Sequence, residues 1–240
     1  MAGLREDYLP AWGYKVYQDP EEFTFTTDSM FLAGFPHLVT KARALELGCG
    51  TGAISLGIAG RGAAQVTGVD LNPRMVELLN RSAAANNLED RVHAELLDIK
   101  RIKGFCPTES FDLVLANPPY RKSGKERIIG TAACHEKTGT LEDFFSAAAY
   151  ALRSRGRFAL VQLPERFMES MELAIRYKLQ PKKLQWVHSA VDKPAWIFLL
   201  EMVKGGSYGL EVLPPLIMYK PDGSLTEQAL EAMEGRRDKK

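Results

Sequence analysis

Strand and helix patterns alternate along most of this chain, and no other feature of the sequence limits its fold as strongly. Apolar runs of the kind that form buried strands recur at 42–47, 65–70, 92–97, 111–116 and 157–163. Segments with the apolar spacing of helices lie between them. This alternation predicts a doubly wound, mostly parallel α/β sheet with helices on both faces.

Two further apolar runs, 183–188 and 196–203, complete the expected sheet. Only a short turn separates them, whereas a parallel pair needs a long crossover connection. We therefore expect one antiparallel strand in a seven-stranded sheet.

The segments on either side of the sheet divide the chain into three parts. Residues 1–22 mix aromatic and charged side chains, and a helical pattern follows at 30–39, with Thr27 or Asp28 as a possible N-cap. We expect an N-terminal arm and capping helix at 1–40, the sheet domain at 41–204, and an extension with a polar tail at 205–240. The extension is expected to add a hairpin or an edge strand.

The composition says more about the cellular compartment of the protein than about its function. The chain of 240 residues carries a net charge of +1, so any basic surface has to be local. Its three cysteines are odd in number and form no CxxC pair, which argues against a disulfide framework or a cysteine-rich zinc site and fits a reducing cytosol. The longest apolar run, 195–200, is too short to span a bilayer. We expect a cytoplasmic protein that binds neither a metal nor a membrane.

Polar or glycine-rich corners follow four of the expected strands. A glycine turn, GCGTG, follows the first strand, and Asp70 ends the second, about 20 residues after Gly50. That spacing suits an acid that binds the hydroxyls of a ribose. Asp98 follows the third strand, although an acid there is often only a helix cap. Ligands of open α/β sheets bind at this carboxyl edge.

The fourth corner is the sequence Asn117-Pro118-Pro119-Tyr120, written NPPY below. Two prolines stop the strand and fix the backbone, which makes a rigid corner. The Asn117 amide oxygen, the Pro118 carbonyl and the Tyr120 ring could together hold a planar amine. Stacking uses the face of the ring, so we expect the Tyr120 hydroxyl to matter little. A plain proline-stopped strand is the alternative reading.

The sequence ELGCGTG at 46–52 resembles the first motif of S-adenosylmethionine-dependent methyltransferases with a Rossmann-like fold. A looser dinucleotide pattern, GxGxxA, also fits, but the NPPY corner argues against a nicotinamide enzyme. The resemblance implies that S-adenosylmethionine is bound at this edge of the sheet. The residues expected to bind it are Phe25, Thr26, Glu46, Gly48, Cys49, Gly50, Thr51, Gly52, Asp70, Leu71, Asp98 and Asn117.

NPPY resembles the catalytic motif of methyltransferases that modify the exocyclic amine of adenine or cytosine, or the amide of glutamine. Together with FTTDS at 25–29, ACHE at 133–136, PER at 164–166, and KGG at 204–206 followed by PPLIMYKPDG at 214–223, it makes the chain similar to the bacterial tRNA(Val) adenine-N6 methyltransferase family over about residues 12–230. This resemblance implies methylation of an adenine beside the anticodon of a tRNA. The implied catalytic residues are Asn117, Pro118, Pro119 and Tyr120.

Two departures from the family lie after NPPY. Cys134 stands where its members have arginine, and the loop after the motif is shorter; both bear on the substrate more than on the reaction. A basic segment at 121–127 directly follows the corner. We expect its side chains to contact RNA phosphates: Arg121, Lys122, Lys125 and Arg127.

Other functions stay open from the sequence. Glutamine methyltransferases of release factors share NPPY but carry a sizeable N-terminal helical domain, and only about 40 residues precede the first strand here. DNA adenine methyltransferases usually add a target-recognition domain, for which no segment is long enough. A non-catalytic cofactor-binding or RNA-binding module is the alternative from another class.

Overall fold

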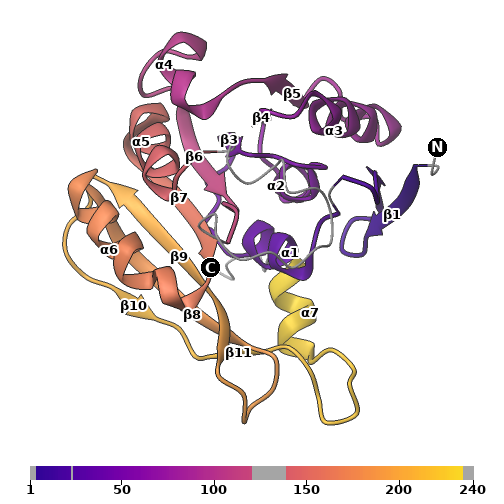
Figure 1. The fold of residues 1–240 in the computed structure, drawn as a ribbon, viewed down its shortest axis with the longest axis vertical. Coiled ribbons are helices and arrows are strands. Elements are labelled where there is room, and N and C mark those ends of the chain that lie inside the picture. Colours follow the sequence, from indigo (N-terminus) through magenta and orange to yellow (C-terminus); the bar gives the residue numbers. More distant parts are fainter. Residues whose placement is uncertain (1–3, 23, 121–138, 235–240) are drawn as a thin grey trace.

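A computed structural model describes residues 4–22, 24–120 and 139–234. Figure 1 shows a central sheet with helices packed on both of its faces. The basic segment 121–127 and the motif at 134–136 lie outside the described residues, so the predictions made for them stay predictions.

Seven strands form the body of the sheet, and they confirm the predicted architecture. They are β3 (Arg43–Leu47), β4 (Gln65–Asp70), β5 (Val92–Leu96), β6 (Phe111–Ala116), β7 (Leu152–Gln162), β8 (Leu179–His188) and β9 (Ala195–Lys204). Their order across the sheet is β8-β9-β7-β6-β3-β4-β5. As expected from the short connection, β9 is antiparallel to both of its neighbours, whereas the other described pairs among the seven are parallel.

The extension after β9 adds two short edge strands. β10 (Glu211–Val212) and β11 (Leu216–Ile217) both pair with β8 in parallel. After β11 the chain turns back on itself, and Tyr219 and Leu225 form an antiparallel bridge. The edge strand that the sequence left open is therefore present, and a short antiparallel turn follows it.

Helices cover both faces of the sheet. On one face lie α1 (Thr27–Gly34), α2 (Ala53–Gly60) and α3 (Pro73–Ala85); on the other lie α4 (Ile102–Phe105), α5 (Leu141–Ala151) and α6 (Phe167–Arg176). Alternate residues of β6 supply the two cores: Leu115 faces the first layer and Val114 the second, and neither is exposed. Burial on both faces explains the continuous apolar run of β6.

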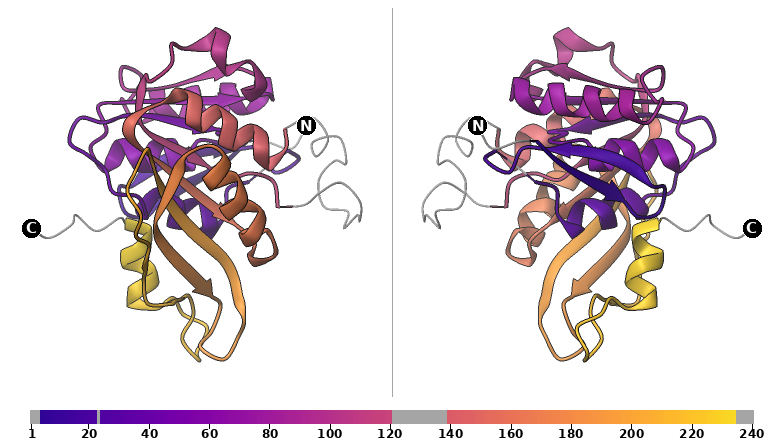
Figure 2. Two further views of the ribbon diagram at one scale, coloured as in Figure 1. Left: turned by 90° about the vertical axis from the view of Figure 1, so that its left-hand side faces the viewer. Right: turned by 90° about the vertical axis from the view of Figure 1, so that its right-hand side faces the viewer.

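The N-terminal arm is a hairpin, β1 (Arg5–Leu9) and β2 (Tyr14–Gln18), which lies beside α3 (Figure 2). Backbone N–H groups of the hairpin bond to side chains of that helix and its C-cap: Lys15 N–H to Asn86 Oδ1 at 2.8 Å, and Tyr17 N–H to Ser82 Oγ at 2.9 Å. These bonds attach the arm to the sheet domain. The boundaries at residues 40 and 204 remain a prediction.

Helix α1 lies earlier in the chain than the pattern at 30–39 predicts. It runs over Thr27–Gly34 with Thr26 at the N-cap, whose side chain makes no capping bond. It cannot continue further because Pro36 has no N–H to donate. Asp28, expected as a cap, instead turns toward Tyr120.

Two helices have no counterpart among the predicted elements. α4 has only four residues, too few for a periodic pattern, and follows the 3-10 turn η1 (Ile99–Arg101). α7 (Glu227–Glu234) buries only Ala229 fully and lies beside α1 (Figure 1).

The strand register brings the predicted corners together. Leu47 at the end of β3 pairs with Val69 on one side and Ala116 on the other, and Asp70 pairs with Leu96. The glycine turn therefore lies between Asp70 and the NPPY corner. The chain passes from β3 through β4 to β5 and then returns to β6 on the opposite side of β3. Ligands of open α/β sheets bind at such a reversal of strand order.

Candidate active site

The glycine turn after β3 has a backbone that favours glycine. Gly48, Gly50 and Gly52 have φ angles of 71°, 51° and 87°, in the left-handed region that side chains disfavour. A Cβ atom on Gly52 would lie 2.1 Å from Leu79 Cδ1, so no larger residue fits without rearrangement. The turn thus brings bare backbone up to the carboxyl edge of the sheet.

Asp70 is bonded directly to this turn. Its Oδ2 accepts the Gly50 N–H and its Oδ1 accepts the Asn72 N–H, both at 2.9 Å. Burial raises the pKa of Asp70, and these N–H donors oppose that shift. Each carboxylate oxygen has a second lone pair, so Asp70 can accept further bonds from a ligand.

Glu46 stands near the end of β3, two residues before Gly48, and its side chain is 2% exposed. Its Oε2 accepts the Ser55 hydroxyl at 2.5 Å. Burial raises its pKa to about 8. In the glycine turn itself, the Thr51 hydroxyl oxygen is buried and has no hydrogen-bond partner within the described residues. A buried polar atom without a partner is rare, and this one lines the cavity described next.

A cavity joins the glycine turn to the NPPY corner. Its lining residues are Phe25, Ser29, Glu46, Gly48, Cys49, Gly50, Thr51, Ala53, Ile54 and Asn117. The structure therefore brings most of the predicted cofactor residues together, with Phe25 arriving from a segment far away in the chain. Ser29 also belongs to the cavity, although its position in a helix start gave no sign of it.

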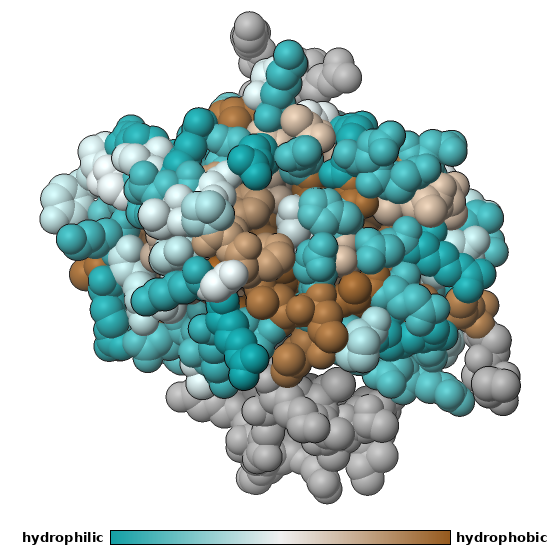
Figure 3. Space-filling model, turned by 90° about the horizontal axis from the view of Figure 1, so that it is seen from above, coloured by the Kyte–Doolittle hydropathy of each residue, from teal (hydrophilic) through white to brown (hydrophobic). Residues whose placement is uncertain are grey.

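Other predicted cofactor residues lie outside this lining. Asp98 accepts the Lys100 N–H at 3.0 Å and caps η1, which is the ordinary role of an acid at a strand end. Leu71 and Leu96 are 37% and 58% exposed beside Asp70 and Asp98. Figure 3 shows hydrophobic side chains gathered in the middle of an otherwise mostly hydrophilic face, seen from above.

The NPPY corner is bonded at both ends to the first turn of α1. Asn117 Nδ2 donates to Ser29 Oγ at 3.4 Å, and Tyr120 Oη donates to Asp28 Oδ2 at 2.5 Å. Asp28 is 1% exposed, and its Oδ1 has no partner among the residues described. Sequence reasoning missed these partners because Asp and Ser at a helix start are ordinary caps.

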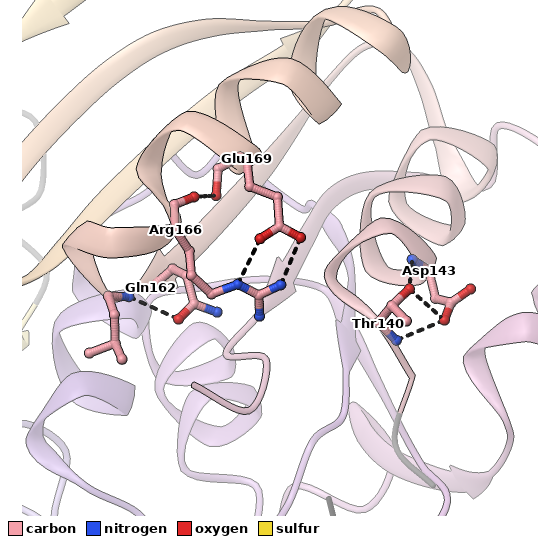
Figure 4. A network of polar contacts seen from close by, with 7 residues as sticks. Thr140, Asp143, Gln162, Arg166 and Glu169 are labelled. Atoms are coloured by element: carbon pink, nitrogen blue, oxygen red, sulfur yellow. Dashed lines mark hydrogen bonds and ion pairs between the residues drawn. The ribbon is translucent and has the colours of Figure 1, made fainter. Parts of the chain in front are cut away.

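On the opposite side of the corner, β7 ends in Gln162, which is not exposed. Its Oε1 accepts the Leu163 N–H at 2.8 Å, as Figure 4 shows. The PER sequence that follows forms the 3-10 turn η2 (Pro164–Arg166). Arg166 donates to both carboxylate oxygens of Glu169, at 3.0 and 2.9 Å, and this ion pair fixes the orientation of the arginine side chain (Figure 4).

The described ranges 4–22, 24–120 and 139–234 contain neither a metal-binding cluster nor a membrane-spanning helix. No group of three or more His, Cys, Asp or Glu side chains there is placed to hold a metal ion. No helix in that part of the chain has the length and apolar character needed to cross a membrane.

Residues 44–135, which include the glycine turn and NPPY, match the family model described as a methyltransferase domain. Solved structures agree on the fold. A predicted O-methyltransferase from Agrobacterium tumefaciens superposes with a TM-score of 0.73 at 24% identity, covering 87% of this chain and 96% of that one. A 16S rRNA N2 G1207 methyltransferase from T. thermophilus, in complex with AdoMet and guanosine, gives a TM-score of 0.62 at 24% identity, covering 84% and 50%. Fold and site thus define an S-adenosylmethionine-dependent methyltransferase.

Curated relatives show to which family of methyltransferases the chain belongs. A tRNA1(Val) (adenine(37)-N6)-methyltransferase from Phocaeicola vulgatus is 31% identical over 182 residues, 73% of this chain and 75% of the relative. One of the same name from Porphyromonas gingivalis is 32% identical over 158 residues, 62% and 60% of the two chains. The chain belongs to the tRNA1(Val) (adenine(37)-N6)-methyltransferase family, as the sequence motifs predict. A putative protein N5-glutamine methyltransferase from Methanocaldococcus jannaschii matches a shorter stretch, 33% identical over 117 residues.

Proposed function

We propose that this protein transfers a methyl group to the N6 amine of an adenine in tRNA, at the position beside the anticodon that its relatives are named for. The observation that carries the proposal is the shared cavity: one hollow is lined by the glycine turn and by Asn117. A methyl donor held by the turn and an amine held by Asn117 would therefore meet.

The residues at the glycine turn suit the polar half of S-adenosylmethionine. When bound, the cofactor supplies a methyl group on a positively charged sulfur. Asp70 has lone pairs for ribose hydroxyls, and the Thr51 hydroxyl is buried without a partner in the described structure, so it is available to a ligand. Glu46 offers a carboxyl group in the cavity lining, where a cationic ligand would favour its ionised form.

Asn117 and Pro118 are proposed to activate the adenine amine. The lone pair of that amine is delocalised into the ring, which makes it a poor nucleophile. The Asn117 amide nitrogen already faces Ser29, which leaves the amide oxygen to accept one amine N–H. The Pro118 carbonyl would accept the other. Both dipoles are fixed in advance, so they stabilise the transition state without reorganisation.

Tyr120 is proposed to stack on the target base and hold it in line. A base in a folded RNA has to be splayed out first, and stacking on an aromatic ring returns roughly 1–3 kcal/mol. The basic side chains Arg121, Lys122, Lys125 and Arg127 are proposed to contact phosphates beside that base. A tRNA substrate would place the protein in the cytoplasm.

Methylation of a glutamine side chain is the second candidate, and one relative, named a putative protein N5-glutamine methyltransferase, favours it. An amide is planar like an adenine amine, so the same corner could hold either. The shared stretch is shorter than that with the tRNA methyltransferases, which cover up to 73% of the chain among those described above. We therefore rank the tRNA substrate first.

One experiment separates these functions. The purified protein is incubated with labelled S-adenosylmethionine and total tRNA from a strain that lacks this gene, and the nucleosides are analysed by mass spectrometry. We expect N6-methyladenosine at one position, and far slower formation of it with Asn117→Ala. Label on glutamine of an added release factor would support the second candidate. Cofactor binding without any transfer would indicate a non-catalytic module.

A further inference from the structure

The first turn of α1 contacts both ends of the NPPY corner across a long stretch of sequence. Asp28 and Tyr120 are 92 positions apart and joined at 2.5 Å; Ser29 and Asn117 are 88 positions apart and joined at 3.4 Å. Local sequence cannot create these contacts. They exist because α1 packs on the sheet face toward which the corner turns.

The Asp28–Tyr120 contact lies in a desolvated place. Asp28 is 1% exposed and has one oxygen without a partner among the described residues, so the Tyr120 hydroxyl is a main donor to this carboxylate. Burial raises the pKa of both groups, which keeps the tyrosine a protonated donor. Without that donor the buried Asp28 carboxylate would be poorly solvated, which costs free energy. This cost favours the conformation in which the Tyr120 hydroxyl stays bonded to α1.

A tyrosine that holds the target base in line by stacking needs an aromatic ring whose plane is fixed. The two prolines before Tyr120 fix the backbone, but the side chain can still rotate about its own bonds. An anchor at the hydroxyl, the far end of the ring, removes that rotation. A base that stacks on an anchored ring is held in one plane relative to Asn117 and the cavity.

We propose that Asp28 is a positioning residue for the methyl transfer: it accepts the Tyr120 hydroxyl and so fixes the aromatic surface on which the target base stacks. The inference rests on the proposed function. It gives the tyrosine hydroxyl a role, contrary to the expectation from sequence that only the ring face matters. The competing explanation is that the pair only stabilises the packing of α1.

Three variants separate the two explanations. Tyr120→Phe keeps the ring and removes only the anchor. Asp28→Ala removes the acceptor, whereas Asp28→Asn keeps an amide oxygen that can accept the same hydroxyl. Tyr177→Phe is the matched control, because Tyr177 also donates to a carboxylate, Glu142, at 3.1 Å, on the α5–α6 side and away from the cavity.

Two measurements are made below the melting temperature of every variant. The first is the single-turnover methylation rate at saturating cofactor and tRNA. The second is the fluorescence of an anticodon stem-loop with 2-aminopurine at the target position, which is quenched when the base stacks on an aromatic ring. Cofactor affinity from calorimetry serves as the internal control.

We expect Tyr120→Phe and Asp28→Ala to slow single turnover by on the order of tenfold to a hundredfold, as misplacement of a reacting group does. Quenching of 2-aminopurine should be lost in both, while the cofactor Kd stays within about threefold of wild type, since neither side chain lines the cavity. Asp28→Asn should restore rate and quenching toward wild type, and Tyr177→Phe should change neither.

Lower melting temperatures with wild-type rates and quenching would overturn the inference and leave only a structural pair. A wild-type protein that methylates no adenine would overturn the proposed function and the inference with it. The two failures are distinguishable, because the first appears only in the variants and the second in the unmodified protein.

Discussion

The Asp70 carboxylate accepts a hydrogen bond at 2.9 Å from the backbone N–H of Gly50, the middle glycine of the turn after β3. The acid expected to bind the cofactor ribose thus also holds the loop expected to bind the rest of the cofactor. Replacing Asp70 would therefore affect the ribose site and also the glycine turn, because the Gly50 N–H would lose its acceptor.

Asp70→Ala is therefore expected to weaken S-adenosylmethionine binding by about 1–3 kcal/mol, through lost charge-assisted bonds to the ribose. Isothermal calorimetry with the methyl donor and with S-adenosylhomocysteine measures the change. Asp112→Ala is the matched control: Asp112 also accepts a backbone N–H, from Arg43 at 2.7 Å, but at the opposite end of the strands. Equal cofactor affinity in both variants would contradict the assignment of Asp70.

Glu46 predicts a pH dependence of stability. Its pKa is about 8 in the folded protein against an ordinary value of 4.5, because burial disfavours the charged form. Between these values the folded state holds a proton that the unfolded state releases. Stability should therefore fall as pH rises from about 5 to 8, by about 1.4 kcal/mol per pH unit at most from this group.

Glu46→Gln removes that proton exchange and keeps a partner for Ser55. Urea unfolding of the cofactor-free protein at several pH values should show a shallower fall for the variant than for wild type, with the difference ending above pH 8. The same slope in both proteins would show that Glu46 titrates normally.

The sequence predicts the sheet well because its physical signals are local. Strands such as β6 are buried on both faces and read as continuous apolar runs, and the short link between β8 and β9 requires an antiparallel pair. The glycine turn and Asp70 are also visible, since each follows a strand. The strand register places them side by side, and the left-handed glycines of the turn bring the Gly50 N–H to within 2.9 Å of the Asp70 carboxylate.

The contacts between segments that are distant in the sequence could not be predicted from local sequence patterns. Asp28 looks like a cap because acids at helix starts are commonly caps. Its bond to Tyr120 depends on how α1 packs against the sheet. Asp98 stands where a cofactor-binding acid is expected and also caps η1 through one oxygen, so its role toward the cofactor stays a prediction. Local patterns cannot tell these two roles apart.

The basic segment after NPPY predicts a salt dependence of RNA binding. Neutralising Arg121, Lys122, Lys125 and Arg127 to glutamine or alanine should reduce the slope of log affinity against log salt by roughly three units if most of them touch phosphate. Filter binding of tRNA at several salt concentrations measures it. An unchanged slope would place the RNA contacts elsewhere, with the N-terminal hairpin as the next candidate.

Asn117→Ala tests the corner that joins the cofactor cavity to the substrate. The amide oxygen acts mainly while the amine becomes tetrahedral, so its loss falls on the transition state and not on ground-state binding. Methyl transfer should drop by at least roughly two orders of magnitude, the contribution of one preorganised polar contact in a dry site, while cofactor affinity stays close to wild type. Single-turnover rates and calorimetry measure the two effects separately. Asn86→Ala is the matched control, because that amide bonds to Lys15 of the hairpin and lies away from the cavity, so it should lower stability without this loss of rate. Near-normal turnover of Asn117→Ala on tRNA would mean that the NPPY corner does not activate the amine.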